Sequence, residues 1–135
     1  MSVQITGKYI GKLGTEITHG PSGTVIKTAA PVDNNGDGSS FSPTDLCASA
    51  IASCMMTIIA IKAEHKELSV DGMNFSLEKH MNQSPRHIAS VPITINLPNS
   101  ISEKDRVLLE KSAMACPVHK SIASYVDIPV TFNYF

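Results

Sequence analysis

The stretch from Leu46 to Ile61 contains no charged residue, and it constrains the fold of this chain more than any other segment. Pro43 suits the first position of a helix, Ser42 is a candidate N-cap, and Asp45 places a carboxylate at the positive end of the helix dipole. A helix that is apolar nearly all round has to be buried. The uncharged run is shorter than the roughly 20 residues that a membrane span requires. We therefore predict a central core helix over Ser42–Lys62.

Two cysteines, Cys47 and Cys54, lie within this predicted helix. Seven residues correspond to nearly two turns, so the two side chains share a face and are roughly 10 Å apart along the axis. A disulfide requires Cα atoms within about 7 Å of each other, so these two cannot bond while the helix is intact. Cys54 becomes reactive only if a cation or a hydrogen-bond donor reaches it from another element or subunit. For every cysteine in the chain the alternative is a small buried hydrophobic side chain, which is the interpretation we favour for Cys47.

The third cysteine, Cys116, is followed by Pro117. Proline is poorly tolerated inside a helix but suits its first position, so we expect Cys116 to be the N-cap of a short helix over 118–125. The helix dipole favours negative charge at this end, and His119 and Lys120 lie in the first turn. These features favour a thiolate at Cys116.

Composition and charge argue against several classes of protein. The formal net charge is −1, and Arg86 and Arg106 are the only arginines, so we do not expect a nucleic-acid partner. An odd number of cysteines without framework spacing argues against a secreted disulfide scaffold. No signal-peptide pattern opens the chain. We expect a cytoplasmic protein with no membrane partner.

The remaining segments predict strands and two further helices. Pro92 indicates an edge position or a bulge in its strand, and a capping-box-like sequence from Ser102 begins the second helix. The predicted strands are Ser2–Ile10, Leu13–His19, Gly23–Ala29, Ser69–His80, Arg86–Leu97 and Pro129–Phe135. The order βββαββααβ does not alternate strand with helix, so we predict one α+β domain over residues 1–135.

No segment has the ligand pattern of a metal site. The loop 33–38 has the composition of a calcium loop but lacks the spaced ligands and the closing glutamate. Cys116 and His119 have ligand-like spacing, but no second pair accompanies them. We therefore expect neither a metal nor another cofactor.

Two motifs together resemble the OsmC/Ohr family of osmotically inducible proteins and organic hydroperoxide resistance proteins. The first is Ser42-Pro-Thr-Asp-Leu with Ala-Ser-Cys54-Met, and the second, roughly sixty residues later, is Ala-Cys116-Pro-Val-His-Lys-Ser. The resemblance covers nearly the whole chain, including the βββα start. It implies the OsmC-like fold, which is an intertwined homodimer with two sheets around two central buried helices and with active sites at the subunit interface.

In the peroxidase members of this family, a helix cysteine attacks the hydroperoxide and becomes a sulfenic acid, which a second cysteine resolves as an intramolecular disulfide. The resemblance implies that Cys54 is the peroxidatic cysteine and Cys116 the resolving one. A dithiol such as lipoamide, or a small thiol, would then act as the reductant. Apolar residues beside the cysteines, such as Ile51, Met55 and Ile58, would line a pocket that favours organic hydroperoxides over hydrogen peroxide.

The chain departs from the peroxidase pattern at two positions. Those members have a glutamate directly after the proline of the helix start, where this chain has Thr44, followed by Asp45. They also supply an arginine from the N-terminal strands, a region that holds no arginine here but has His19 in a glycine-rich turn. His19 would then be the cation beside the thiolate, and Asp45 its orienting carboxylate. These differences place the chain closer to the OsmC-like branch of the family.

The sequence leaves three functional hypotheses. The leading one is a thiol-dependent peroxidase that reduces hydroperoxides in oxidative-stress defence. The second is a non-enzymatic OsmC-like dimer that senses redox state or binds a small molecule, and the third is a structural dimer with inert cysteines. Consumption of an organic hydroperoxide in the presence of dihydrolipoamide, compared with a Cys54→Ser variant, distinguishes the first hypothesis from the other two.

Overall fold

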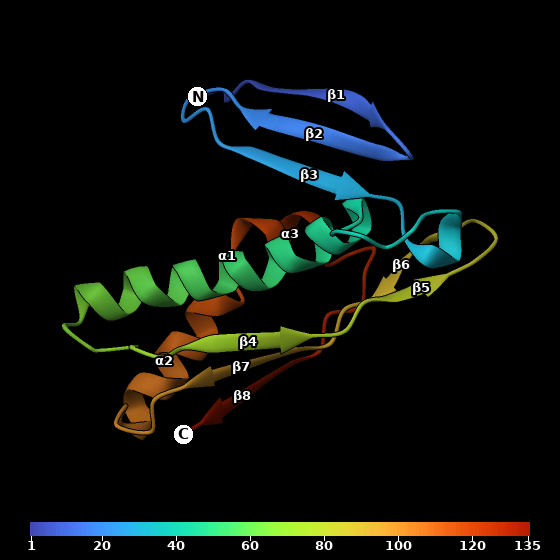
Figure 1. Ribbon diagram of the computed structural model, residues 1–135. Helices are drawn as coiled ribbons and strands as arrows, with labels where there is room; N and C mark the ends of the chain where they lie inside the picture. The colour runs from blue at the N-terminus through green and yellow to red at the C-terminus, as the bar shows by residue number, and fades with distance from the viewer. The chain divides into compact units, whose positions relative to one another are not determined.

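The computed structural model describes residues 1–135, which divide into two units, Met1–Cys47 and Ala48–Phe135. The boundary falls inside the long helix α1 (Pro43–His65), so the first turn of α1 belongs to the first unit. The other elements of the first unit are β1 (Ile5–Gly11), β2 (Gly14–His19), β3 (Val25–Ala29) and a short 3₁₀ helix, η1 (Val32–Asn34). Those of the second are β4 (Asn74–Leu77), β5 (His80–Asn82), β6 (His87–Ser90), β7 (Ile93–Leu97), α2 (Glu103–Ala113), α3 (Pro117–Ile122) and β8 (Val130–Tyr134) (Figure 1).

The first unit contains the predicted antiparallel meander, with β2 as its central strand. A two-residue loop joins β1 to β2, and its residues Lys12 and Leu13 both have positive φ, 52° and 60°. Such a loop matches the right-handed twist of the flanking strands. The glycines on either side, Gly11 and Gly14, pair with each other across the end of the hairpin.

The two faces of this sheet differ in polarity. Gly7, Ile17 and Ile26 are aligned across the three strands. Side chains alternate along a strand, so Ile5 and Tyr9 lie on the same face as Ile17 and Ile26. Ile5 is 60% exposed and Tyr9 is 67% exposed. The single chain therefore leaves the apolar face of this sheet largely uncovered.

Helix α1 begins with a capping box at the predicted position. The backbone N–H of Asp45 donates to Ser42 Oγ at 3.0 Å, and the backbone N–H of Ser42 donates to Asp45 Oδ2 at 2.8 Å. This exchange satisfies two backbone donors at the start of the helix. The helix runs to His65, three residues past the apolar core segment that ends at Lys62.

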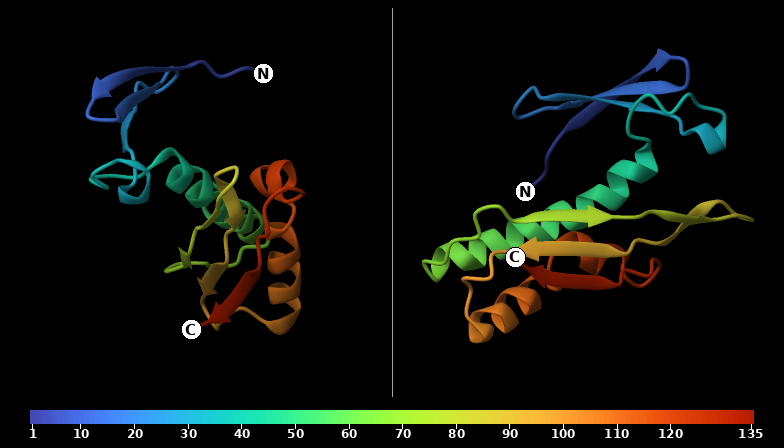
Figure 2. Two further views of the ribbon diagram at one scale, coloured as in Figure 1. Left: turned by 90° about the vertical axis from the view of Figure 1, so that its right-hand side faces the viewer. Right: turned by 60° about the horizontal axis from the view of Figure 1, so that its bottom comes forward.

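The second unit packs helices against one face of a mixed sheet in the order β4-β7-β8, in which β4 is antiparallel and β8 parallel to β7. Helices α1 and α2 lie on the same side of this sheet (Figures 1 and 2). Along β7, the buried Ile93, Ile95 and Leu97 alternate with the less buried Thr94 and Asn96, as expected for a strand with one face on the core. The buried residues of α1 are Ala48, Ile51, Ala52, Met55, Ile59 and Ala63.

By length and hydropathy alone, α1 would also pass as a membrane span, because it has 23 residues and a window of mean hydropathy 1.9. Its buried residues belong to the same hydrophobic core as those of β7 and α2. One face of α1 therefore packs as a core helix does, whereas the single chain does not bury the helix on all sides as the sequence predicts.

Two of the predicted strands are each divided in two. The segment Ser69–His80 contains β4 and the start of β5, and Arg86–Leu97 contains β6 and β7. Strands β5 and β6 form a separate hairpin that extends beyond the three-stranded sheet (Figure 1). Pro92 lies between β6 and β7, and its carbonyl accepts a hydrogen bond from the backbone N–H of Glu78 at 3.1 Å. The proline thus separates two strands, because it has no N–H for a continuous ladder.

Candidate active site

Cys54 lies at the margin of the buried face of α1. Its neighbours Ile51 and Met55 are completely buried, Ser53 is exposed, and Cys54 itself is half-buried. The helix therefore holds the thiol against the core while leaving part of it accessible. Ile51 and Met55 belong to the core and Ile58 is half-buried, and their role in lining a substrate pocket stays a prediction.

Cys116 is the N-cap of α3, as predicted. It is completely buried, and its backbone is extended, with φ −63° and ψ 141°. Its Sγ accepts a hydrogen bond from the backbone N–H of His119 at 3.2 Å. Pro117 occupies the first helical position, where its missing N–H leaves no donor unsatisfied.

The fold brings Cys54 and Cys116 together from distant parts of the sequence. The Cys54 thiol lies near enough to the Cys116 thiol to raise its pKa, and both are free thiols in this structure. Both residues belong to the second unit, where Cys54 packs against the core that includes Cys116. This contact meets the first requirement for a disulfide between them, which is proximity of the two sulfur atoms.

The surroundings of Cys116 do not favour a thiolate. Burial raises the pKa of the Cys116 thiol, and the neighbouring Cys54 thiol raises it further, while the N–H of His119 acts in the opposite direction. The prediction of a preformed thiolate at this position is therefore wrong. Loss of water around the sulfur outweighs the helix terminus, because a buried anion loses its solvation.

Cys47 occupies a different environment from the other two thiols. It is exposed and free, so the interpretation as a small buried hydrophobic side chain is wrong for the single chain. It lies in the first turns of α1, and no disulfide joins it to Cys54.

The three residues predicted to support the thiols all lie in the first unit. His19 ends β2, and its Nδ1 is hydrogen-bonded to Ser22 Oγ at 2.6 Å. Thr44 Oγ1 is 3.0 Å from Ser42 Oγ, and the Asp45 carboxylate accepts the Ser42 N–H in the capping box. Because Cys54 and Cys116 belong to the second unit, the action of these three residues on the thiols stays a prediction.

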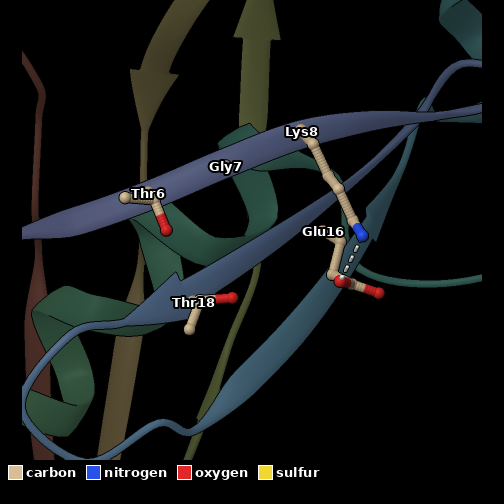
Figure 3. A pocket seen from close by; sticks show the side chains of 5 residues that line it. All are labelled: Thr6, Gly7, Lys8, Glu16 and Thr18. Atoms are coloured by element: carbon tan, nitrogen blue, oxygen red, sulfur yellow. Dashed lines mark ion pairs between the residues drawn. The ribbon is translucent and has the colours of Figure 1, made fainter.

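The first unit also contains a pocket of about 170 Å³ on the polar face of its sheet. Figure 3 shows Lys8 and Glu16 directed toward each other across β1 and β2, and their ion pair measures 3.5 Å. The remaining lining residues are Thr6, Gly7 and Thr18. None of the five supplies a thiol, so this pocket does not provide the chemistry predicted for the chain.

The sequence profile of the family described as OsmC-like protein matches residues 36–131, which include both Cys54 and Cys116. This chain belongs to the OsmC-like family. A crystal structure from Psychrobacter arcticus 273-4, of a protein named provisionally for osmotic stress induction and a detoxification response, is 38% identical to it. The match covers 98% of this chain and 96% of that one, with a TM-score of 0.89.

More distant relatives of this OsmC-like protein share its fold. The organic hydroperoxide resistance protein OsmC of Legionella pneumophila is 17% identical, with a TM-score of 0.78 over 98% of this chain and 97% of that one. The organic hydroperoxide resistance protein OhrB of Bacillus subtilis is also 17% identical, with a TM-score of 0.67 over 98% of each chain. No curated protein is significantly similar in sequence.

One contact in this OsmC-like protein was missed at the level of sequence. His119 was expected to act through the charge of its side chain, but the structure brings its backbone N–H to the sulfur of Cys116. The signal was present in the sequence, because an N-cap side chain ordinarily accepts from the backbone N–H two or three positions into the helix. Pro117 has no N–H, so the donor to the Cys116 sulfur had to come from a residue after this proline.

Proposed function

We propose that this OsmC-like protein is a thiol-dependent peroxidase that reduces organic hydroperoxides, with Cys54 as the peroxidatic and Cys116 as the resolving cysteine. The observation that carries the proposal is the contact between the two thiols, combined with their unequal burial. A half-buried thiol can meet a substrate, and a completely buried thiol beside it can meet only the product of that reaction.

The proposed cycle has three steps whose atoms balance. The Cys54 thiolate attacks the outer oxygen of the hydroperoxide, the O–O bond breaks, and the organic group leaves as an alcohol after taking up a proton. The resulting sulfenic acid is attacked by the Cys116 sulfur, and its hydroxyl leaves as water when the disulfide forms. A dithiol or small-thiol reductant then restores both thiols by exchange.

The order of attack follows from the environments of the two sulfurs. Cys116 is completely buried and its thiol pKa is raised, so it is a poor first nucleophile. Of these two sulfurs, Cys54 is the one that a hydroperoxide can approach. The difference in burial between the two thiols therefore supports the assignment of roles independently of the resemblance.

We propose a supporting role for His19, Asp45 and Thr44 near the Cys54 thiolate. His19 would be the cation that stabilises the thiolate, and the Asp45 carboxylate would orient the His19 ring. A cation is needed from another residue because the N-terminal strands, which carry an arginine in the peroxidase members of the family, contain no arginine in this chain. Thr44 would occupy the position of the family's glutamate. Relatives named as organic hydroperoxide resistance proteins support the choice of substrate class.

The test measures the loss of cumene hydroperoxide with dihydrolipoamide as the reductant. The parent protein should consume the hydroperoxide and form the Cys54–Cys116 disulfide within each chain, and Cys54→Ser should abolish both. Cys116→Ser should stop at a trappable sulfenic acid on Cys54, whereas Cys47→Ser should behave as the parent does. Lower efficiency with hydrogen peroxide is expected, because only an organic tail gains apolar burial.

Two results would overturn the proposal in different ways. A sulfenic acid that forms on Cys116 in the Cys54→Ser variant as fast as oxidation proceeds in the parent would reverse the roles. If the parent neither consumes hydroperoxide nor forms the disulfide, the enzyme hypothesis is wrong, and the hypothesis of a dimer that binds a small molecule remains.

A further inference from the structure

We propose that formation of the Cys54–Cys116 disulfide releases the N-cap of α3, so that the redox state of the thiol pair controls the order of this helix. The inference rests on the proposed function for its physiological oxidant, a hydroperoxide. Its structural basis is that one sulfur atom, Cys116 Sγ, takes part in two local interactions that compete once it is oxidised.

The first interaction is the cap of α3. The first intrahelical hydrogen bond runs from Lys120 N–H to the Cys116 carbonyl at 3.0 Å, which leaves the donors before it without a helical partner. Pro117 has no N–H, and the N–H of His119 is taken by Cys116 Sγ. The sulfur therefore performs the task that a serine or aspartate oxygen performs in most helices.

Little else holds this helix in place. It has six residues, none of them buried, and no acidic residue lies in its first turn. Ser121 Oγ donates to the Pro117 carbonyl at 2.8 Å, which is a contact within the helix itself. Only partly buried side chains, among them Val118 and Ile122, pack against the core. A short helix of this kind depends on its cap more than a long buried one does.

The second interaction is the contact with Cys54, which becomes a covalent bond on oxidation. One molecule of hydroperoxide removes two electrons from the pair, the alcohol and water leave, and the sulfurs move from non-bonded contact to bonding distance. Cys54 is fixed in a helix of 23 residues, one face of which is buried in the core, so the movement falls on Cys116 and the start of α3. The oxidised sulfur is bonded to Cys54, and it moves away from the His119 N–H.

The loss of the cap has a consequence for turnover. Any free energy that α3 loses on oxidation destabilises the disulfide relative to the dithiol. A less stable disulfide has a higher reduction potential and is reduced more readily by a thiol. The cap would thus favour return to the reduced state, in which the protein can accept another hydroperoxide.

The experiment measures backbone amide exchange by NMR in the full-length protein before and after oxidation. Diamide, an azo compound that takes two electrons and two protons from a thiol pair, serves as oxidant alongside cumene hydroperoxide, and mass spectrometry verifies the disulfide. We expect the His119 amide to exchange roughly fivefold faster in the oxidised protein, the factor that corresponds to the loss of a typical cap. The Asp105 amide, capped by the Ser102 hydroxyl at the start of α2, should not change.

A matched pair of variants separates the cap from the disulfide. Reduced Cys116→Ala loses the cap without oxidation and should show the fast His119 exchange of the oxidised parent. Cys116→Ser keeps a capping oxygen and should show slow exchange with or without oxidant, as should Cys54→Ser, which keeps the capping sulfur.

Three outcomes would overturn the inference. They are unchanged His119 exchange in protein whose disulfide is verified, an equal increase at Asp105, and failure of diamide to join the two cysteines. A disulfide that forms with diamide but not with hydroperoxide would instead overturn the proposed function, and the exchange measurement would still decide the inference.

Discussion

Cys54 and Cys116 carry the same functional group, and their surroundings make them chemically different. One is half-buried on the flank of α1, and the other is completely buried with its thiol pKa raised by loss of solvent. A raised pKa lowers the thiolate fraction at any given pH, and burial restricts approach of a reagent. Both effects lower the reactivity of the Cys116 thiol.

We therefore predict that iodoacetamide alkylates Cys54 at least about tenfold faster than Cys116 in the reduced, folded protein at pH 8. A Cys47→Ser background removes the exposed thiol, and peptide mass spectrometry against time gives both rates. The alkylation rate of Cys116 should continue to rise with pH in a range where that of an unhindered thiol has levelled off. Equal rates for the two cysteines would contradict the assignment of roles.

The surroundings of Tyr134 also shift the pKa of its side chain, although this residue lies outside the candidate active site. Its hydroxyl donates to Glu110 Oε1 at 2.7 Å, and the Arg106 guanidinium lies 4.0 Å from the ring centroid. Burial raises the pKa of Tyr134, and the hydrogen bond to Glu110 raises it further. This cluster joins α2 to the last strand, β8.

The raised pKa of Tyr134 predicts a loss of stability at alkaline pH. An unfolded tyrosine loses its proton near pH 10, whereas the folded Tyr134 keeps it. The unfolded state therefore binds fewer protons above this pH, so the contribution of Tyr134 to the free energy of unfolding is complete below pH 10 and decreases as pH rises. Urea unfolding at pH 8 and pH 11 should show a smaller decrease for Tyr134→Phe than for the parent. An identical decrease in both proteins would contradict the prediction.

Among the elements, α1 and α2 both begin with a serine N-cap, which is buried in α1 and exposed in α2. Ser42 is 1% exposed and its Oγ accepts the Asp45 N–H at 3.0 Å, whereas Ser102 is exposed and the equivalent distance to the Asp105 N–H is 3.3 Å. A buried donor left without an acceptor is more destabilising than one that water can reach.

Ser42→Ala should therefore lower the free energy of unfolding by about 1–2 kcal/mol, and Ser102→Ala by about 0.5–1 kcal/mol. Urea denaturation followed by circular dichroism measures both values under the same conditions. The reverse order would indicate that the α1 cap is satisfied by other groups after the substitution.

At the scale of the whole molecule, the single chain leaves two apolar surfaces uncovered. One is the face of the first sheet that carries Ile5, Tyr9 and Ile26, and the other is the outer stripe of α1, which includes Ala50 and Ile61. Exposed apolar surface of this extent is typical of a protein–protein contact. We expect a second copy of the chain to cover these surfaces in the homodimer predicted from the sequence.

We predict that the protein is an obligate homodimer and that Ala50→Glu in α1 dissociates or unfolds it. Val107→Glu is the matched control, because Val107 is an exposed apolar residue of α2, 67% exposed, outside both surfaces. Light scattering at micromolar concentration should give twice the chain mass for the parent and the control. A folded parent monomer would contradict this prediction.

Local patterns in the sequence determined where most elements begin. Pro43 after Ser42, Pro117 after Cys116 and the capping sequence at Ser102 each marked a helix start that the structure confirms. These signals work because caps and prolines act within a few residues of each other. The strand pattern was less complete: Pro92 indicated an edge position or a bulge, whereas the structure ends β6 before this proline and begins β7 after it.

The properties of the thiols depended on the tertiary structure. The sequence indicated a helix terminus at Cys116 and therefore a thiolate, but a hydrogen bond to one N–H is a local effect and the loss of solvent around the sulfur is not. Which residues bury an atom is decided by segments far apart in the chain, here by the packing of α3 against a core shared with α1. The same holds for Cys47, which the helical pattern placed in a buried run and the tertiary structure leaves exposed, because a helix apolar on all sides does not specify which of its faces the rest of the chain will cover.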